Sequence, residues 1–227
     1  MAEDERNSRK EELAQKYGID FDKLESEQLK IAKELEIKNK IDFSLVERYG
    51  AVDAIFVGNK ILCCVIVCDK DFEIVDRAYV LEKIKFPYVP GFRNYREMEA
   101  MVLAYEKLNE KPDVVFVSGQ GITHPRLGLA SHFGLSVGVP AIGVSDSVVE
   151  CEASDKDGSE IVKDGKKVGK VLISKLGSRP MFISPGEGIT VDKAYEIAKD
   201  LVRLPHKRPE PMHLVSKYAK EVRGELV

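Results

Sequence analysis

One carboxylate interrupts an apolar run that otherwise has the pattern of a buried strand. Asp53 stands within residues 51–56, where the other residues are all apolar. An unpaired carboxylate buried in a sheet costs on the order of several kcal/mol unless it is ion-paired or bound to a metal. A solvated strand face is the ordinary alternative for Asp53. The sequence favours a metal ligand, because carboxylate oxygens suit hard divalent cations.

A glycine-rich segment follows a second apolar run and carries groups that can contact phosphate. Residues 119–126 come directly after the run that ends with Val117 and Ser118. Glycines at such a place let a ligand approach the backbone closely, and His124 and Arg126 offer phosphate contacts. The segment therefore indicates a ligand site at the end of this strand.

Other polar residues have ordinary alternatives beside the functional ones. Glu97 lies near the start of an expected helix, where the helix dipole alone favours an anion. Tyr88 either stacks on a base, worth about 1 to 3 kcal/mol, or closes its own loop. The basic segment 206–208 is either solvated charge or a patch that contacts phosphate.

The elements that must position these groups follow an α/β order. Residues 21–38 have helical spacing, and residues 50–84 form three β-rich runs separated by turn residues. The later elements are an expected helix over 94–109, a strand over 113–117, a helix over 127–138 and a strand over 140–144. Uniformly apolar runs suit parallel strands that are covered on both faces. This order predicts an α/β, ribonuclease-H-like fold with a mixed five-stranded sheet and helices on both faces.

The predicted strand order sets which residues meet at the site, and the segment after residue 155 is expected to lie at the periphery. The first and fourth strands of the sheet are neighbours, so Asp53 and residue 118 are expected to lie close together. A hydrophilic excursion over 155–168 is expected to return through short strands over 170–174 and 181–184, as a hairpin at the periphery. The last core helix is expected over 190–203.

Length and composition limit the class of protein. The chain has 227 residues, of which 44% are hydrophobic and 32% charged, which excludes wholesale disorder, collagen and disulfide scaffolds. A net charge of −3 means that a nucleic-acid partner must be met by local basic groups. We expect residues 1–19 to form a flexible charged segment and residues 20–227 to form a single, monomeric domain.

The cysteines and the N-terminus indicate the compartment. Cys63, Cys64 and Cys68 lie in one apolar run, where alternation rather than metal-ligand spacing makes them buried apolar residues. The N-terminus has no apolar signal region, and no run approaches the roughly 18 apolar residues of a membrane span. We therefore expect a cytoplasmic protein with no membrane partner.

Five blocks of the sequence resemble, in order, those of the endonuclease V family. They are PYVPGFRNYRE (87–97), VFVSGQGITHPRLGLASHFG (115–134), VPAIGV (139–144), RPMFISPGEGITVDKA (179–194) and RPEPMH (208–213). The resemblance covers about residues 24–216, and chance does not explain several long blocks in the correct order.

This resemblance implies a Mg²⁺-dependent endonuclease, with Mn²⁺ as an alternative cation, that acts in nucleic-acid repair. Such an enzyme recognises inosine in deaminated DNA or RNA and cuts the second phosphodiester bond on its 3′ side. By position, Asp53 and Glu97 match metal-binding catalytic acids, and His124 matches a histidine near the scissile phosphate.

The resemblance also implies a surface for the nucleic acid. The wedge that enters the duplex beside the lesion matches Pro87, Tyr88, Val89 and Pro90. Gly119 and Gly121 match glycines beside the extruded base, and Arg126 offers a phosphate contact. Base extrusion costs a few kcal/mol, least for a mispaired inosine.

The chain departs from the family pattern within the expected site. Ser118, in Ser-Gly-Gln-Gly, stands where the family's Asp-Gly-His-Gly has its second metal-binding Asp. Asp146 stands at the family's Lys after the fifth strand, and Glu187 at the late His of its Pro-Gly-His block. A neutral serine removes a full negative charge, so Mg²⁺ is expected to bind more weakly.

The substitutions leave two main accounts open. In the first, Asp146 and Glu187 join Asp53 and Glu97 as relocated metal ligands, and activity survives in altered form. In the second, the chain keeps the fold, wedge and base pocket but binds nucleic acid without cutting it. The gain of two acids favours the first account. A protein-interaction module is a third alternative, given the acidic net charge.

Overall fold

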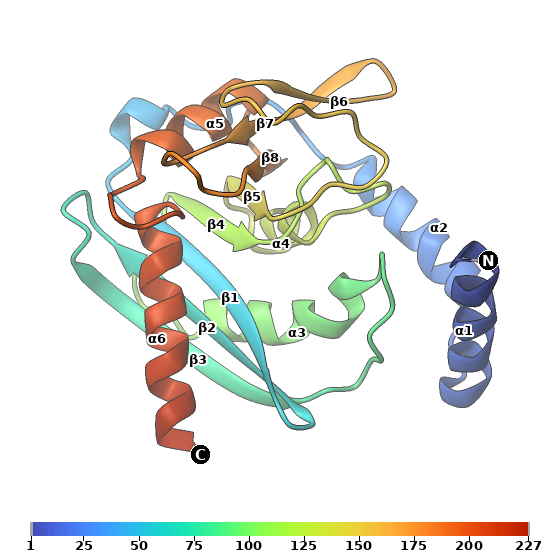
Figure 1. Ribbon diagram of the computed structural model, residues 1–227. Helices are drawn as coiled ribbons and strands as arrows, with labels where there is room; N and C mark the ends of the chain where they lie inside the picture. Colours follow the sequence, from blue (N-terminus) through green and yellow to red (C-terminus); the bar gives the residue numbers. More distant parts are fainter. Residues whose placement is uncertain (1, 227) are drawn as a thin grey trace.

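A mixed sheet of eight strands lies at the centre of the computed structural model, which describes residues 2–226, with side chains from residue 10 onward (Figure 1). The strand order is β3-β2-β1-β4-β5-β8-β7-β6. The strands are β1 (Tyr49–Val57), β2 (Lys60–Cys68), β3 (Ile74–Lys83), β4 (Val114–Ser118), β5 (Ala141–Ser145), β6 (Glu160–Lys163), β7 (Lys166–Leu172) and β8 (Met181–Glu187). The pairs β1–β4 and β4–β5 are parallel, and all the others are antiparallel.

The first three strands form the antiparallel meander that the sequence predicted. β1 turns into β2 at Gly58 and Asn59, and Gly58 has a φ of +59°, a conformation that glycine adopts without strain. Val52 of β1 is level with Val117 of the neighbouring parallel strand β4. Asp53 and Ser118 are the next residues of these two strands and therefore lie side by side. The expected closeness of these two positions is therefore confirmed.

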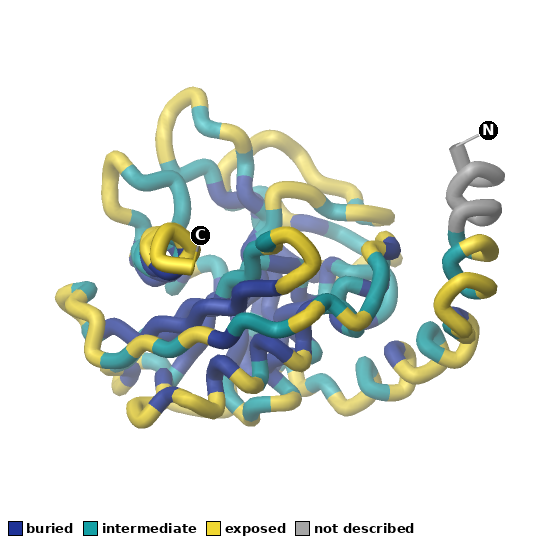
Figure 2. Tube along the Cα trace, turned by 90° about the horizontal axis from the view of Figure 1, so that it is seen from below, coloured by how far each residue is buried: buried dark blue, intermediate teal, exposed yellow. Residues whose placement is uncertain are grey.

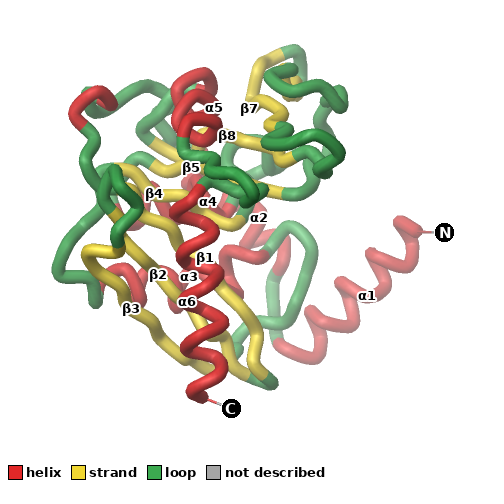
Figure 3. Tube along the Cα trace, turned by 60° about the vertical axis from the view of Figure 1, so that its left-hand side comes forward, coloured by secondary structure: helices red, strands yellow, loops and turns green. Residues whose placement is uncertain are grey.

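Helices cover both faces of the sheet. Within residues 2–226 the helices are α1 (Ala2–Tyr17), α2 (Phe21–Ala32), α3 (Arg93–Glu106), α4 (Leu129–Val137), α5 (Val191–Asp200) and α6 (Glu210–Leu226), with a 3-10 turn at Phe43–Leu45. Figure 3 shows α6 on one side of β1–β3 and α3 on the other. The strands between the helices are buried, as the dark trace at the centre of Figure 2 shows.

Strand β2 is covered on both faces, which explains why its sequence is apolar after Lys60. Leu62, Cys64 and Ile66 belong to the core under α5 and α6, whereas Cys63 and Val65 belong to the core under α3 and α4. Successive side chains of a strand point to opposite faces, so a strand covered on both faces needs no polar position. The cysteines of this run are therefore buried apolar residues, as predicted.

The N-terminal helices differ from expectation in extent. The predicted helix over residues 21–38 ends at Ala32, and its first turn is capped by the Asp20 carboxylate, which accepts a hydrogen bond from the Lys23 amide. Phe21 of α2 packs on Val89 and Phe92, just before α3. Residues 1–19 include helix α1, and their flexibility stays a prediction.

The predicted fold class is confirmed, but the strand count is eight rather than five. β8 pairs with β5 from Phe182 to Glu187, and the hairpin of β6 and β7 continues the sheet from there. The expected strands over 170–174 and 181–184 correspond to β7 and β8, whereas β6 lies within the excursion that was expected to be without strands, and all three strands belong to the central sheet. No helix in the described part of the chain is long and apolar enough to span a membrane.

Candidate functional site

A cavity of about 640 Å³ opens where strands β4 and β5 end. These strands are parallel neighbours, so the segments that follow them, 118–120 and 145–147, meet at one edge of the sheet and line the cavity. Ligand sites of open α/β sheets commonly occupy this position, outside the carboxyl ends of parallel strands. Tyr88 and Pro90, from the loop before α3, form another wall.

The predicted wedge divides into outward and inward residues. Tyr88 is 57% exposed and lines the cavity, as does the exposed Pro90. Val89 is buried in the cluster with Phe21, and Pro87 is half-buried outside the cavity. Val89 therefore anchors the loop on α2 while its two neighbours face solvent.

The two predicted base-pocket glycines have different environments. Gly119 lines the cavity. Gly121 lies against β8, where its amide donates to Ser184 Oγ at 2.8 Å and an added Cβ would be 2.0 Å from the Pro185 carbonyl oxygen. Gly121 thus permits a close backbone contact with β8, and it does not line the cavity.

His124 and Arg126 both line the cavity, and both have protein partners. Arg126 donates from Nε to Gln28 Oε1 at 2.6 Å and from Nη2 to the Gly91 carbonyl at 3.2 Å, which joins α2 to the wedge loop. His124 Nδ1 accepts from the Arg126 amide at 3.1 Å. Burial, with the charges of Arg126 and Lys163, lowers the pKa of His124 to about 4, so the imidazole is neutral at pH 7.

The two matched family acids, Asp53 and Glu97, do not line the cavity. Glu97 is 2% exposed, and both its oxygens accept from Arg93, at 2.8 and 2.7 Å. The Oδ1 of Asp53 accepts from the Ala54 amide at 3.0 Å, and its Oδ2 accepts from Ser216 Oγ at 3.3 Å. Burial raises the pKa of Asp53.

Two guanidinium groups lie between these acids and the cavity. Arg93 Nη2 donates to the Ser118 carbonyl at 3.3 Å, and Arg208 Nη1 donates to Ser118 Oγ at 3.4 Å. Both arginines and Ser118 line the cavity. Asp53 is close enough to both arginines for its charge to act on them. The cavity wall in front of the acids therefore presents two guanidinium groups, each paired with a carboxylate.

Asp146 lies at this cavity, as the idea of relocated ligands requires. Its carboxylate is 59% exposed and accepts from Arg208 Nη2 at 2.7 Å and from Lys207 Nζ at 3.2 Å. Asp146 is thus already paired with two cations on the segment before α6.

Glu187 lies elsewhere. β8 runs antiparallel to β5, and Glu187 is level with Ala141 at the start of β5, whereas Asp146 follows the end of that strand. The buried Glu187 carboxylate accepts from the Glu36 amide at 2.9 Å and forms an ion pair with Lys40. The structure therefore does not bring Glu187 to the other acids, because the register of β8 sets it at the opposite end.

The donor set does not fit a Mg²⁺ ion in this arrangement. Mg²⁺ requires near-octahedral oxygen ligands and takes them mainly from carboxylates and substrate phosphates. Arg93 holds both oxygens of Glu97, Ser118 is neutral, and Asp146 is paired with Arg208. In residues 10–226, no three carboxylates of the expected set have oxygens within 4.8 Å of one another.

The sequence is similar to known proteins over most of its length. The model of the Endonuclease V family matches residues 29–217. The chain belongs to the endonuclease V family. Endonuclease V of Thermosipho melanesiensis is 35% identical over 217 residues, covering 92% of this chain and 91% of that protein. Endonuclease V of Archaeoglobus fulgidus is 31% identical over 212 residues, covering 92% and 96%.

Solved endonuclease V structures share the fold. That of Streptomyces avermitilis superposes with a TM-score of 0.82 at 24% identity, covering 92% of this chain and 96% of that one. Endonuclease V of Ciona intestinalis, in complex with a 24mer DNA containing an inosine followed by a ribo-adenosine, gives 0.81 at 19% identity, covering 91% and 98%. The endonuclease V fold thus extends over nearly the whole chain.

Three residues at the site were not singled out from the sequence. Arg93 precedes Glu97 by four residues, a helical spacing that places the two on one face and could have revealed the ion pair. Arg208 lay in the basic segment that was left open between solvated charge and phosphate contact. Nothing in the sequence marked Ser216, because its contact with Asp53 joins residues 163 positions apart.

Proposed function

We propose that this chain binds inosine-containing DNA or RNA at the cavity without efficient cleavage. Membership of the endonuclease V family and the inosine-containing DNA bound by the Ciona intestinalis protein support the substrate class. The observation that carries the proposal is the cavity wall: Arg93, Ser118 and Arg208 line it, and Asp53 and Glu97 do not.

The arginines are suited to hold a phosphodiester. Planar guanidinium groups donate in pairs to phosphate oxygens, and such contacts supply most of the non-specific affinity for nucleic acid. Arg208 now pairs with Asp146, which is 59% exposed, and exposed ion pairs of this kind contribute about 0 to 1 kcal/mol. A phosphate can therefore replace Asp146 as the partner of Arg208 at little cost.

The remaining walls suit an extruded base. A volume of about 640 Å³ is within the usual range for sites that enclose small ligands. Tyr88 presents an exposed ring on which a base can stack, and Gly119 forms part of the cavity lining. Inosine pairs weakly, so extruding it costs less than extruding an ordinary base.

A second candidate is metal-dependent cleavage of the second phosphodiester bond on the 3′ side of inosine, with Mg²⁺ or Mn²⁺. The observation in its favour is that Asp53 and Glu97 are both retained and both lie next to Arg93. The family is one of metal-dependent nucleases, and in this candidate His124 lies near the scissile phosphate. Arg93 would have to release Glu97 before that carboxylate could bind a cation.

Fluorescence anisotropy with matched duplexes tests the binding function. One duplex carries inosine and the other carries adenosine at the same place, and each is titrated with protein in EDTA, as DNA and as RNA. We expect tighter binding of the inosine duplex without any divalent cation. Equal affinity for both duplexes would contradict inosine recognition.

A further inference from the structure

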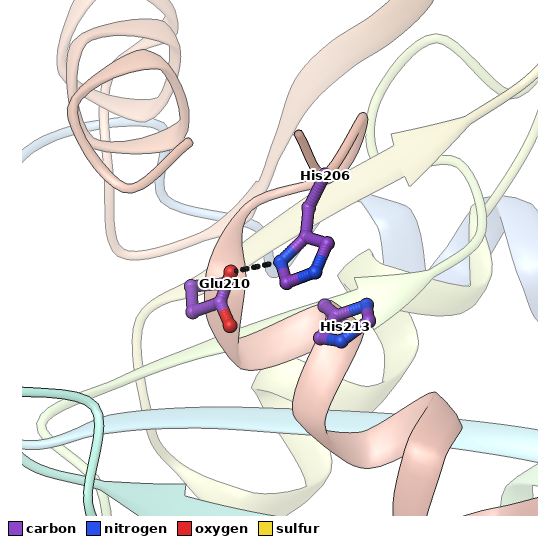
Figure 4. A group of neighbouring side chains, drawn as sticks. All are labelled: His206, Glu210 and His213. Carbon is purple, nitrogen blue, oxygen red and sulfur yellow. Dashed lines mark hydrogen bonds and ion pairs between the residues drawn. The ribbon is translucent and has the colours of Figure 1, made fainter. Parts of the chain in front are cut away.

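We propose a second, unrelated metal site, formed by His206, Glu210 and His213 at the start of α6, and we assign Zn²⁺ as its cation. Each of these side chains offers a ligand atom, and the three atoms lie within 4.8 Å of one another. Figure 4 shows His206 reaching down from the loop before α6 toward Glu210 and His213 in the first turns of the helix. In the described part of the chain, no other group of three such side chains is this close.

The backbone brings the three ligands together. Glu210 and His213 are three residues apart on α6, and residues at this spacing share one face of a helix. His206 lies in the loop between α5 and α6, whose ends are joined by the bridge between Val202 and Pro209. The Glu210 amide also donates to the Leu201 carbonyl at 2.8 Å. The loop therefore holds His206 over the helix start before any ion binds.

The donor chemistry selects a transition metal. Two imidazoles and one carboxylate suit Zn²⁺ and its neighbours, whereas Mg²⁺ and Ca²⁺ prefer oxygen ligands alone. Three protein ligands leave a fourth position for water, as in open zinc sites. All three side chains are partly exposed, so an ion can enter from solvent.

The His206 and His213 rings must change their relative orientation before both can bind one ion. The His206 and His213 rings are stacked, with centroids 3.5 Å apart and planes 14° apart, and His206 Nδ1 lies 2.7 Å from Glu210 Oε2. The lone pair of an imidazole nitrogen lies in the plane of its ring, so two nearly parallel rings cannot both aim at one ion. Binding must therefore turn one ring out of the stack, and His206, on the loop, has the freedom to turn.

An ion at this place would stabilise a segment that reaches the cavity. The same loop carries Lys207 and Arg208, which pair with Asp146. A bound cation would join this loop to α6 through His206 and thereby restrict the position of both cations. The metal site itself does not depend on the proposed binding of nucleic acid.

Isothermal titration with Zn²⁺ tests the site in tag-free, chelator-treated protein. The background is Cys151→Ser, which removes the one cysteine that is not fully buried. We expect one ion per chain. His206→Gln and His213→Gln should each lower the affinity roughly tenfold or more, because each removes a ligand. His132→Gln, which removes an imidazole from α4, is the matched control and should leave the affinity unchanged.

Two further readouts separate the site from a structural role of the same residues. Zn²⁺ should raise the melting temperature of the parent protein but not that of His206→Gln, which lies in a loop. Zn²⁺ should also shift the ring-proton NMR signals of His206 and His213 as the stack opens. Zinc affinity unchanged in His206→Gln and His213→Gln, or no stoichiometric zinc binding by the folded parent, would overturn the proposal.

Discussion

At the scale of single residues, Ser118 has a decisive position. It contacts one guanidinium through its carbonyl and a second through its hydroxyl. These groups belong to Arg93 and Arg208, each paired with a carboxylate, and Arg208 can exchange the exposed Asp146 for a phosphate. Recognition of a phosphodiester can therefore persist in a site whose carboxylates are shielded.

The arrangement predicts that restoring the acid alone is insufficient. In Ser118→Asp the new carboxylate would lie beside Arg208 and pair with it, so little gain in Mn²⁺-dependent nicking of inosine DNA is expected. Ser118→Asp combined with Arg208→Leu leaves the carboxylate free for a cation. We expect the double variant to nick roughly tenfold or more faster than the single variant in a single-turnover gel assay. Equal rates for the two variants would show that Arg208 does not obstruct the acid.

Arg208 is also expected to act as a phosphate contact. Arg208→Ala should weaken binding of inosine and adenosine duplexes alike and should reduce the slope of log affinity against log salt by about 1. The measurement is anisotropy over a series of salt concentrations. Arg203→Ala is the matched control, since Arg203 lies in the same segment, is exposed and donates only to nearby carbonyls. A slope unchanged by Arg208→Ala would remove Arg208 from the interface.

The half-buried imidazole of His124 makes stability depend on pH. Burial lowers its pKa from 6.5 to about 4, so between these values the unfolded chain binds more protons than the folded one. Stability is therefore complete above pH 6.5 and is lost as the pH falls toward 4. From pH 7 to pH 5 the loss attributable to His124 is about 2 kcal/mol. Urea unfolding of the parent and of His124→Gln at both pH values measures it, and an equal pH dependence in the two proteins would contradict the assignment.

At the scale of elements, the turn after β4 depends on a glycine. Gly121 lets this turn pack against β8, because an added Cβ would lie 2.0 Å from the Pro185 carbonyl oxygen. Gly121→Ala should destabilise the protein by about 1 to 3 kcal/mol, as expected for overpacking that moves backbone. Gly224→Ala on α6 is the control, since an added Cβ meets nothing within 4 Å there. Unfolding of both variants in urea gives the comparison, and a neutral Gly121→Ala would show that the turn can relax.

The elements that the sequence predicted well are those whose pattern is local. The meander of β1–β3 followed from three β-rich runs separated by turn residues, and β4 and β5 from uniformly apolar runs. The strand count was too low because the pairing of β8 with β5 joins segments about 40 residues apart, and residue patterns do not specify such a partner.

The same distinction applies to the candidate site. Asp53 and Ser118 were expected to be close because strand order alone brings β1 beside β4. The position of Glu187 depends instead on the antiparallel register of β8, which sets it beside Ala141 and away from Asp146. Arg208 reaches the cavity from the loop before α6, a long-range contact that no local pattern reports.

At the scale of the whole molecule, helix α6 and the loop before it contact the strands that carry the candidate site. α6 and its preceding loop supply Ser216 to Asp53 and Arg208 to Ser118, so the C-terminal part of the chain completes the site built by β1 and β4. Conservation of the family fold over nearly the whole chain is compatible with a change in what the site does. The monomeric state and the cytoplasmic location stay predictions.

The central claim is that paired guanidinium groups stand where an accessible metal centre would be, and single-turnover nicking by the parent protein tests it most directly. An end-labelled inosine duplex is incubated with excess protein in Mg²⁺, in Mn²⁺ and in EDTA, at concentrations where anisotropy shows the duplex fully bound. The account predicts a bound and intact strand under all three conditions. A product cut at the second phosphodiester bond 3′ to inosine, formed with either cation, absent in EDTA and lost in Asp53→Asn, would contradict it.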